Sequence, residues 1–223
     1  MIRTLLVGAL LLAAPVLAQA QGAGYPLKAD DGTLIQNKKI KPDVVKEAEK
    51  LPGAVIAANP QGDVTLVEFY DLNCPFCRRA SADVDAMVKA DPRLRLVLVP
   101  FPVLGIPSIL AGRVEIAVSK AVPPEKFYEF HRAVYAGRGT IDGQRALAVA
   151  TGPLGLDAQK ILDAANDDGI TDIMKAHLRF ANTHGTKATP LFLVQDVLVD
   201  GYPGPKTLKA VVAAARKCGK AMC

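Results

Sequence analysis

The 223-residue sequence has no tryptophan, only three histidines and only four cysteines, and these scarcities exclude several classes of protein. Four cysteines are few for a scaffold held together by disulfides, and a chain this long that is rich in Val, Leu, Ile and Ala can bury a core without them. The histidines (His131, His177 and His184) all lie in one helical block, away from the cysteines. The second half of a structural zinc site is therefore missing, and no metal is expected.

A strong excess of one charge is also absent, because 27 Lys and Arg face 22 Asp and Glu. The basic residues are scattered and do not alternate with aromatic residues, so the sequence does not indicate nucleic-acid binding. We find no internal repeat and no low-complexity tract. Beyond the first 20 residues no segment is long and apolar enough to span a bilayer, so stable membrane insertion is not expected.

The N-terminus has the features of a secretory signal peptide. Arg3 supplies a short positive region, Leu5 to Leu17 forms a run without charged residues, and Ala18-Gln19-Ala20 matches a cleavage signal. We predict a signal peptide over residues 1–20, cleaved after Ala20, and hence export to the periplasm. In that oxidising compartment disulfides form and persist.

Residues 21–59 are predicted to be an N-terminal lead-in, separate from a main domain over residues 60–223. Asp31-Gly32 indicates a turn between two short extended stretches. Apolar residues from Ile40 to Leu51 recur at helical spacing, and Pro52-Gly53 ends this helix. We expect the stripe to pack on its own domain.

The start of the main domain is predicted to be a strand, a helix and a second strand. Val64 to Tyr70 is a dense run of β-branched and aromatic residues, typical of a strand buried on both faces. It leads into "NCPFCRR", after which apolar residues follow helical spacing as far as Asp91-Pro92. Residues 93–101 form a second buried strand. This order predicts a parallel pair of strands.

The remainder is predicted to contain a helical block over about residues 105–184 and then two strands and a last helix. Gly and Pro separate five helical segments of the block: Ile109–Ala121, Glu125–Tyr135, Gly143–Ala150, Asp157–Ala165 and Thr171–Thr183. Strands follow at 189–194 and 197–201, with Gln195-Asp196 as the turn, and a helix covers 204–217. The predicted fold class is α/β, a thioredoxin-like fold with a central helical insertion.

The pair Cys74 and Cys77 stands where a buried strand gives way to a helix. Free N–H groups and the helix dipole favour an anion there, so a thiolate at Cys74 has a lowered pKa and becomes the attacking nucleophile. Pro75 at the first helical position costs no hydrogen bond. Cys77 follows one turn later, more buried and able to close a disulfide.

Glu68 is a carboxylate in the middle of an apolar strand, where a charge is costly unless it has a partner or a purpose. It could take the proton of Cys77 when that thiol attacks a mixed disulfide. A structural carboxylate facing a polar gap or a lysine is the alternative.

The stretch "VTLVEFYDLNCPFC" resembles the active-site strand and helix start of the thioredoxin superfamily. With the helical insertion and Thr189-Pro190 before an apolar strand, the chain is similar to DsbA-like periplasmic thiol–disulfide oxidoreductases over residues 60–216. The resemblance implies that Pro190 is a cis-proline facing Cys74 and that Thr189 presents its backbone to substrate. It implies cysteine-containing exported proteins as substrates, a membrane redox partner and no cofactor.

Two positions bear on the direction of the reaction. Phe76, counted among the substrate-binding residues, stands where the strongest oxidant of the family has a histidine. Phenylalanine cannot stabilise a thiolate, so we expect Cys74 to be acidic, yet less so than the family extreme of about 3.5. Thr189 resembles the residue that precedes the cis-proline in the isomerase and copper-tolerance relatives of the group. This favours a reductase or isomerase over an oxidase.

The C-terminal "RKCGKAMC" holds the second pair, Cys218 and Cys223. Gly219 suits a left-handed residue after a helix, and the turn would let the two cysteines form a structural disulfide. The alternative is a soft site for Cu(I) made with Met222.

The sequence thus predicts a protein-disulfide oxidoreductase or isomerase. Cys74 and Cys77 would be its redox pair and Glu68 its proton relay, with Thr189 and Pro190 docking the substrate. The alternative function is a copper-binding or copper-tolerance protein with the same fold.

Overall fold

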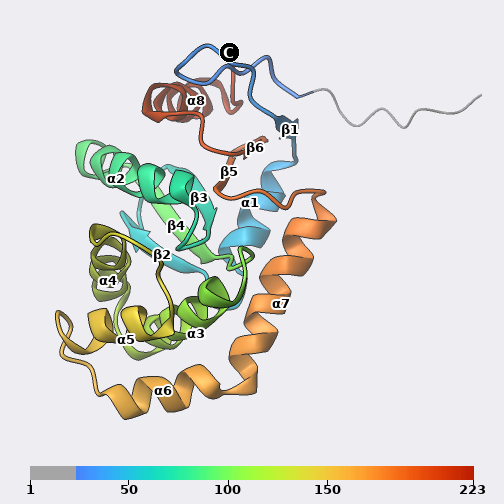
Figure 1. Ribbon diagram of the computed structural model, residues 1–223. Helices are drawn as coiled ribbons and strands as arrows, with labels where there is room; N and C mark the ends of the chain where they lie inside the picture. The colour runs from blue at the N-terminus through green and yellow to red at the C-terminus, as the bar shows by residue number, and fades with distance from the viewer. Residues whose placement is uncertain (1–23) are drawn as a thin grey trace, which may run out of the picture.

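The structure, a computed structural model, describes residues 24–223, so the predicted signal peptide and its cleavage site lie outside the described residues. The described chain forms one six-stranded sheet with helices on both faces (Figure 1). The strands lie in the order β1-β6-β5-β3-β4-β2. Their bounds are β1 (Asn37–Lys39), β2 (Val55–Ala58), β3 (Val64–Tyr70), β4 (Leu94–Pro100), β5 (Leu191–Val194) and β6 (Val197–Asp200).

The predicted strand–helix–strand unit is confirmed at the centre of the sheet. β3 pairs in parallel with β4, and α2 (Pro75–Ala90) connects them. On its other side β3 pairs with β5 in the antiparallel sense. The redox pair therefore follows directly from a strand that has a hydrogen-bonded neighbour on both sides.

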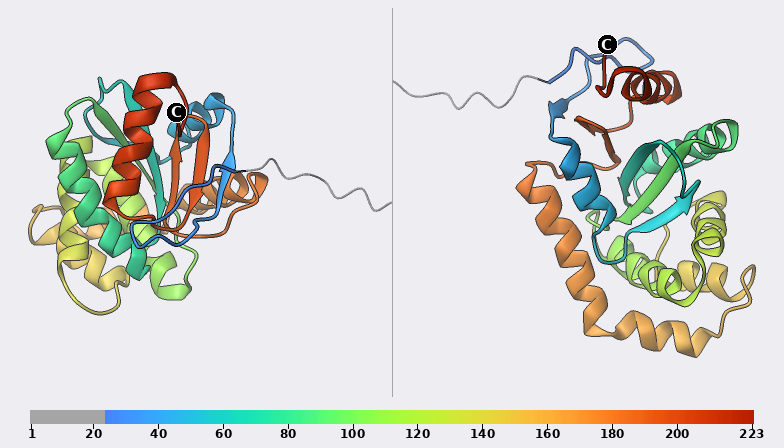
Figure 2. Two further views of the ribbon diagram at one scale, coloured as in Figure 1. Left: turned by 90° about the horizontal axis from the view of Figure 1, so that it is seen from above. Right: turned by 180° about the vertical axis from the view of Figure 1, so that it is seen from behind.

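Side chains of β3 alternate between the two faces of the sheet, as a pleated strand requires. Leu66 and Tyr70 belong to the core that includes α2 and α8 (Pro205–Cys218). Val67 and Phe69 belong to the opposite core, with α1 (Pro42–Glu49) and α7 (Asp168–Thr183). Figure 2 shows the two layers of helices around the sheet. Glu68 lies in register with Leu66 and Tyr70, so its carboxyl group faces the α2 side.

The predicted helical insertion is confirmed between β4 and β5, and the described residues contain no strand there. It consists of α3 (Ile106–Ala121), α4 (Pro124–Ala136), α5 (Gly143–Thr151), α6 (Ala158–Asn166) and α7. The observed helices start or end within about three residues of the predicted bounds. In Figure 1 the insertion occupies the lower part of the molecule, and α7 leads back from it to β5.

The lead-in differs from the prediction, because it is not separate from the main domain. β1 pairs with β6 and β2 pairs with β4, so residues 37–58 supply both edge strands of the sheet. α1 buries Val45 and Ala48 against the sheet, which agrees with its expected packing on its own domain. A strand at β2 was not predicted, since "VIAA" is only four residues long and directly follows a turn.

The C-terminal hairpin and helix agree with the prediction. β5 and β6 are antiparallel neighbours joined at Gln195, which has a positive φ of 50°. α8 buries Leu208, Val211 and Val212 at helical spacing. Gly219 ends it in the left-handed conformation, with φ of 71°.

Candidate redox site

Cys74 is the N-cap residue of α2, and Pro75 occupies the first turn. The Cys74 side chain is buried, with 4% of its surface exposed. A hydrogen bond from the Cys77 thiol lowers the pKa of Cys74 to about 6, and the Thr189 side chain and the backbone N–H groups of Cys77 and Phe76 contribute in the same direction. Burial opposes this effect without cancelling it. Cys74 is therefore largely a thiolate at neutral pH.

Cys77 lies one turn further along α2 and is fully buried. Burial raises its pKa well above the usual range of a thiol, and the hydrogen bond to Cys74 and the charge of Glu68 add to this effect. The two cysteines thus have opposite properties. The lowered pKa makes Cys74 the cysteine of the pair that is suited to attack a disulfide, while the raised pKa keeps Cys77 protonated.

Glu68 lies beneath the pair and is 1% exposed. Burial, together with the negative charge of Cys74, raises the pKa of Glu68 to about 8. Its Oε2 atom has no hydrogen-bond partner among the described residues. Among the described residues no Lys or Arg forms an ion pair with Glu68.

Thr189 and Pro190 complete the site from the start of β5. The peptide bond between them is cis, as the resemblance implied. The Cys74 sulfur lies 3.2 Å from the carbonyl oxygen of Thr189, to which it donates a hydrogen bond when it is protonated. Phe76 lies on the outer surface beside this contact, 51% exposed, with the guanidinium of Arg79 over its ring at 5.6 Å.

The family model described as "Thioredoxin" matches residues 50–214, which is most of the chain. The chain belongs to the thioredoxin family. A thioredoxin-like oxidoreductase from Silicibacter pomeroyi is 36% identical with a TM-score of 0.69, over 76% of this chain and 98% of that one. The thiol-disulfide exchange protein alpha-DsbA2 from Wolbachia pipientis shares the fold at 21% identity with a TM-score of 0.68, over 77% and 94% of the two chains. The predicted membership of the thioredoxin superfamily is thereby confirmed, and the likeness to alpha-DsbA2 is one of fold.

A curated relative of this thioredoxin-family chain is much longer. The Na(+)/H(+) antiporter NhaA of Herminiimonas arsenicoxydans is 24% identical over 179 residues, which cover 80% of this chain. The chain spans only 27% of that protein's length. Within residues 24–223 no helix has the length and apolar character needed to cross a membrane.

Asp71 is a site residue that sequence reasoning missed in this thioredoxin-family protein. Its carboxylate is 1% exposed and accepts four hydrogen bonds. The donors are Asn73 N at 2.8 Å, Ser108 Oγ at 2.7 Å, Val103 N at 2.8 Å and Leu104 N at 2.9 Å. Asp71 therefore ties the redox turn to the loop between β4 and α3. The position of Asp71, three residues before Cys74, could have pointed to a role in the site. Three of its four hydrogen-bond donors, however, lie in a distant segment of the chain.

The backbone of Asp71 serves the same turn. Its carbonyl oxygen accepts hydrogen bonds from the backbone N–H of Cys74 at 3.0 Å and from the hydroxyl of Tyr135 at 3.1 Å. Its N–H group is directed at the Cys77 sulfur. One residue thus contacts both cysteines and the insertion.

Two of the three histidines are buried at structural positions. His131 is buried beside Glu115, at 3.4 Å between Nδ1 and Oε1, and Tyr70 donates a 2.8 Å hydrogen bond to the same carboxylate. His177 is buried between the carbonyl oxygens of Pro100 and Pro52, each 2.6 Å away. Among the described residues no group of three or more His, Cys, Asp or Glu is arranged to hold a metal ion.

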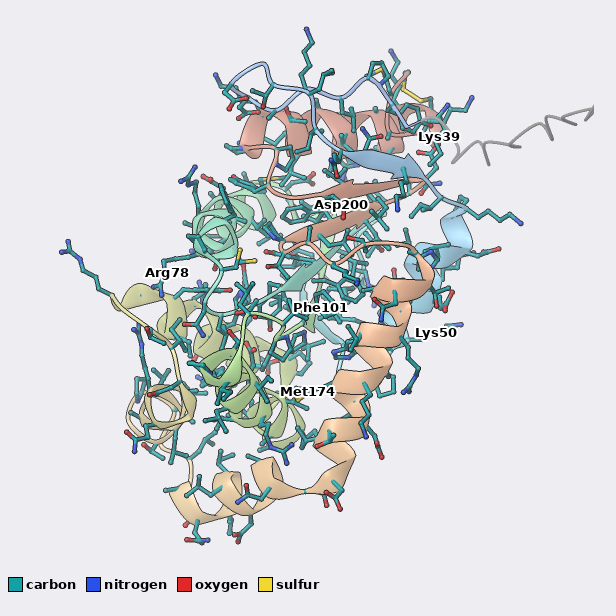
Figure 3. The ribbon with its side chains drawn as sticks, turned by 45° about the vertical axis from the view of Figure 1, so that its right-hand side comes forward. Lys39, Lys50, Arg78, Phe101, Met174 and Asp200 are labelled. Carbon is teal, nitrogen blue, oxygen red and sulfur yellow. A yellow bond between two sulfur atoms is a disulfide. The ribbon has the colours of Figure 1, made fainter. Side chains whose placement is uncertain are left out.

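The C-terminal cysteines, Cys218 and Cys223, form a disulfide in the structure, with 6.3 Å between their Cα atoms. The yellow bond at the top of Figure 3 marks it. Ala221 within this loop donates its N–H to Asp196 at 2.7 Å, which fastens the tail to the turn after β5. Met222 is 41% exposed.

Proposed function

We propose that this chain is a thiol–disulfide oxidoreductase that exchanges disulfides with cysteine-containing exported proteins. The observation that carries the proposal is the contrast within the pair, an acidic Cys74 beside a Cys77 that retains its proton. The relatives described as a thioredoxin-like oxidoreductase and as a thiol-disulfide exchange protein support the same reaction class.

In the oxidising direction the Cys74–Cys77 disulfide accepts two electrons. A substrate thiolate attacks Cys74, which forms a mixed disulfide and releases Cys77, and Cys77 takes up a proton. A second substrate thiolate then attacks the substrate sulfur of that bond. The substrate leaves with a disulfide, and Cys74 leaves as a thiolate.

In the reducing direction the Cys74 thiolate attacks a substrate disulfide and releases one substrate thiol. The Cys77 thiol must then lose its proton to attack Cys74 and close the internal disulfide. Glu68, buried on the same side of the sheet, is the base we assign to this step. With a pKa of about 8 it exchanges protons near neutral pH.

The docking of the substrate is assigned to Thr189 and Pro190. The carbonyl oxygen of Thr189 lies beside Cys74, where an extended substrate backbone can add to the edge of the site. Phe76, two residues after Cys74, supplies exposed apolar surface near the sulfur.

The direction that we propose is reduction and isomerisation in the periplasm. A Cys74 pKa of about 6 is closer to the value near 7 of thioredoxin than to the value near 3.5 of DsbA. Exchange can then run both ways, as reshuffling requires. The predicted signal peptide supports export, and a membrane redox partner would recycle the pair.

The test is an insulin-reduction assay and a scrambled-ribonuclease assay on residues 21–223, with Cys74→Ser as the matched variant. We expect activity in both assays and its loss in the variant. The copper alternative predicts tight Cu(I) binding without exchange activity, so a copper titration is run on the same samples. Equal activity of wild type and Cys74→Ser would contradict the proposed function.

A further inference from the structure

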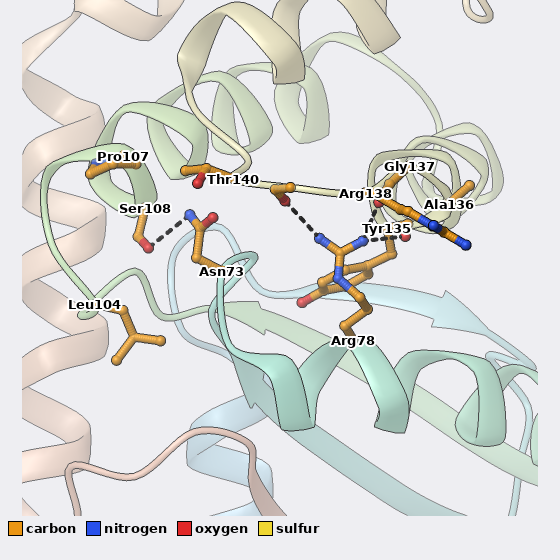
Figure 4. Close-up of a pocket in the computed structure, with 11 residues that line it drawn as sticks. Asn73, Arg78, Leu104, Pro107, Ser108, Tyr135, Ala136, Gly137, Arg138 and Thr140 are labelled. Carbon is orange, nitrogen blue, oxygen red and sulfur yellow. Dashed lines mark hydrogen bonds between the residues drawn. The ribbon is translucent and has the colours of Figure 1, made fainter.

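A pocket of about 710 Å³ lies beside the redox pair (Figure 4). Three segments form its walls: the start of α2 with Asn73 and Arg78, the β4–α3 region with Leu104 and Ser108, and residues 135–140 between α4 and α5. Asn73 directly precedes Cys74, and Arg78 directly follows Cys77. The pocket therefore adjoins the turn that carries Cys74, and its other walls come from the insertion and the loop that leads into it.

The charged side chains that line this pocket are both arginines, Arg78 and Arg138. Arg145 binds the same loop from α5. Within residues 24–223 none of the three arginines has an ion-pair partner. The first turn of α3, at the pocket wall, contains no acidic residue, and its dipole adds positive potential. We call this hollow the arginine pocket.

Hydrogen bonds hold the loop of the arginine pocket in place. Arg78 donates to the carbonyl oxygens of Tyr135 and Gly137, and to that of Gly139 at 3.3 Å, as Figure 4 shows. Arg145 donates to the carbonyl oxygen of Gly139 at 3.2 Å. Carbonyl oxygens orient a guanidinium without neutralising its charge, so the pocket keeps its positive potential.

Arg138 differs from the other two arginines. It is exposed, and its side chain makes no hydrogen bond with the described residues, while its backbone lies in the loop that Arg78 and Arg145 hold. The buried carboxylate nearest the pocket wall is Asp71, which bonds to Asn73 and Ser108. Four donors already occupy it, so it does not pair with these arginines.

We infer that the arginine pocket binds an acidic side chain of the polypeptide substrate, located within two or three residues of the cysteine that reacts with Cys74. This inference rests on the proposed function. Two or three extended residues span roughly 7–10 Å, enough to leave the sulfur and enter a pocket that begins at Asn73. A guanidinium matches a carboxylate in geometry and charge. Leu104 supplies an apolar wall for the methylene groups of a glutamate.

The test uses synthetic peptides with one cysteine activated as a chromogenic aromatic disulfide. Attack by the Cys74 thiolate on the peptide sulfur forms the peptide–Cys74 disulfide and releases the aromatic thiolate, which is measured. Peptides carry Glu, Gln or Leu two residues from the cysteine. At low salt the second-order rate constant should be about two- to fivefold higher for the Glu peptide than for the Gln peptide, which is the size of effect that an exposed ion pair has. The ratio should fall at 0.5 M salt.

Arg138→Gln removes the free charge and leaves the hydrogen bonds of Arg78 and Arg145. It should lower the Glu-to-Gln ratio by about half or more, and the charge of Arg78 accounts for the preference that remains. Arg179→Gln is the matched control, because Arg179 is exposed on α7 and makes no hydrogen bond or ion pair with the described residues. The control changes the net charge equally and should keep the wild-type ratio.

Two results would overturn the inference. One is equal rates for the Glu and Gln peptides in wild type, and the other is a Glu preference that Arg138→Gln does not alter. A preference for Leu that persists in Arg138→Gln would assign the pocket to an apolar side chain instead. Failure of every peptide to react with Cys74 would contradict the proposed function itself, and the inference with it.

Discussion

The sulfur of Cys74 and the carbonyl oxygen of Thr189 lie 3.2 Å apart, although 115 positions separate the two residues in the chain. Cys74 lies at the start of α2 and Thr189 just before β5, and the pairing of β3 with β5 brings the two together. The reactive sulfur is therefore held between a helix start and a strand start. Its electrostatics and its substrate contact have separate origins and can be changed separately.

Titration of the reduced protein should show a Cys74 thiolate with a midpoint near pH 6, read from its absorbance at 240 nm. The hydrogen bond from Cys77 is the largest cause of the shift. Cys77→Ala should therefore raise the midpoint towards the usual 8.5, and Cys77→Ser, which keeps a donor, should raise it less. Equal midpoints in both variants would show that this hydrogen bond does not tune Cys74.

The same shift links stability of the reduced form to pH. The folded pKa of Cys74 is lower than the unfolded value, so its contribution is complete above about pH 8.5 and is lost as the pH falls through 6. The oxidised form lacks this group. Urea unfolding measures the free energy of unfolding of the reduced and oxidised forms between pH 5 and 9. The reduced form should lose stability relative to the oxidised form as the pH falls from about 8.5 to 6.

Glu68→Gln should slow the attack of Cys77 on the mixed disulfide, because the variant cannot take the proton. Its pH profile should lose the rise near pH 8. Trapping with a peptide disulfide should show more mixed disulfide than in wild type. Wild-type turnover with an unchanged level of trapped intermediate would return Glu68 to a structural role.

Glu68 also makes a prediction for stability. A carboxyl group whose folded pKa is raised binds protons on folding between its unfolded pKa of about 4.3 and 8, so the free energy of unfolding falls as the pH rises through this window. Glu68→Gln should show a flatter dependence, with a difference of about 3.5 kcal/mol between pH 5 and 8. Parallel curves for the two proteins would contradict the raised pKa.

Phe76→His should make the disulfide a stronger oxidant. The side chain stands at the helix start beside Cys74, and histidine would add a donor to the thiolate. One hydrogen bond to a charged group contributes roughly 1.5–3 kcal/mol, which corresponds to roughly 30–60 mV for a two-electron couple. A glutathione titration measures the potential, and the Cys74 pKa should fall in parallel. An unchanged or lower potential would show that this position does not tune the sulfur.

Asp71→Asn keeps the shape of the side chain but replaces one acceptor by a donor. At least one of its four N–H or O–H partners then lacks an acceptor, so we expect a loss of about 2–4 kcal/mol in the free energy of unfolding. Insulin reduction should also slow. Asp85→Asn is the control, since Asp85 binds Lys89 and Arg132 away from the redox turn and should change stability by about 1 kcal/mol or less.

Removing the C-terminal disulfide with Cys218→Ser and Cys223→Ser should lower stability by about 2 kcal/mol, the value for so short a loop. Exchange activity at Cys74 should remain, because the tail contacts Asp196 at the other end of β5. Thermal unfolding and the insulin assay test both points. Loss of activity in the double variant would indicate that the second pair takes part in electron transfer.

Much of the fold could be predicted because it depends on local patterns. The β-branched run at 64–70, the five helical segments and the hairpin at Gln195 all appear where their residues indicate. The short edge strand β2 was missed, since its four residues are identified only by their pairing with β4. The lead-in was wrongly separated for the same reason, because β1 and β2 become part of the domain through distant partners.

The residues of the candidate site also fall into those that local patterns predict and those that depend on distant contacts. Cys74, Cys77 and Glu68 could be predicted because spacing along one strand and one helix places them together. Thr189 and Pro190 came only through a family resemblance. The hydrogen bonds of Asp71 depend on segments that are far apart in the sequence, and so does the arginine pocket. A local sequence pattern cannot predict such contacts.

The pairing of β3 with β5 across the insertion sets an order of assembly for the site. Synthesis proceeds from the N-terminus at about 5–20 residues per second, so the 115 residues between Cys74 and Thr189 take roughly 6 to 23 s to make. Throughout this interval both redox cysteines exist without the carbonyl that later covers them. The segment from Glu68 to Cys77 is therefore made well before Thr189, so a newly made chain carries both thiols of the pair before the segment that is proposed to dock the substrate exists.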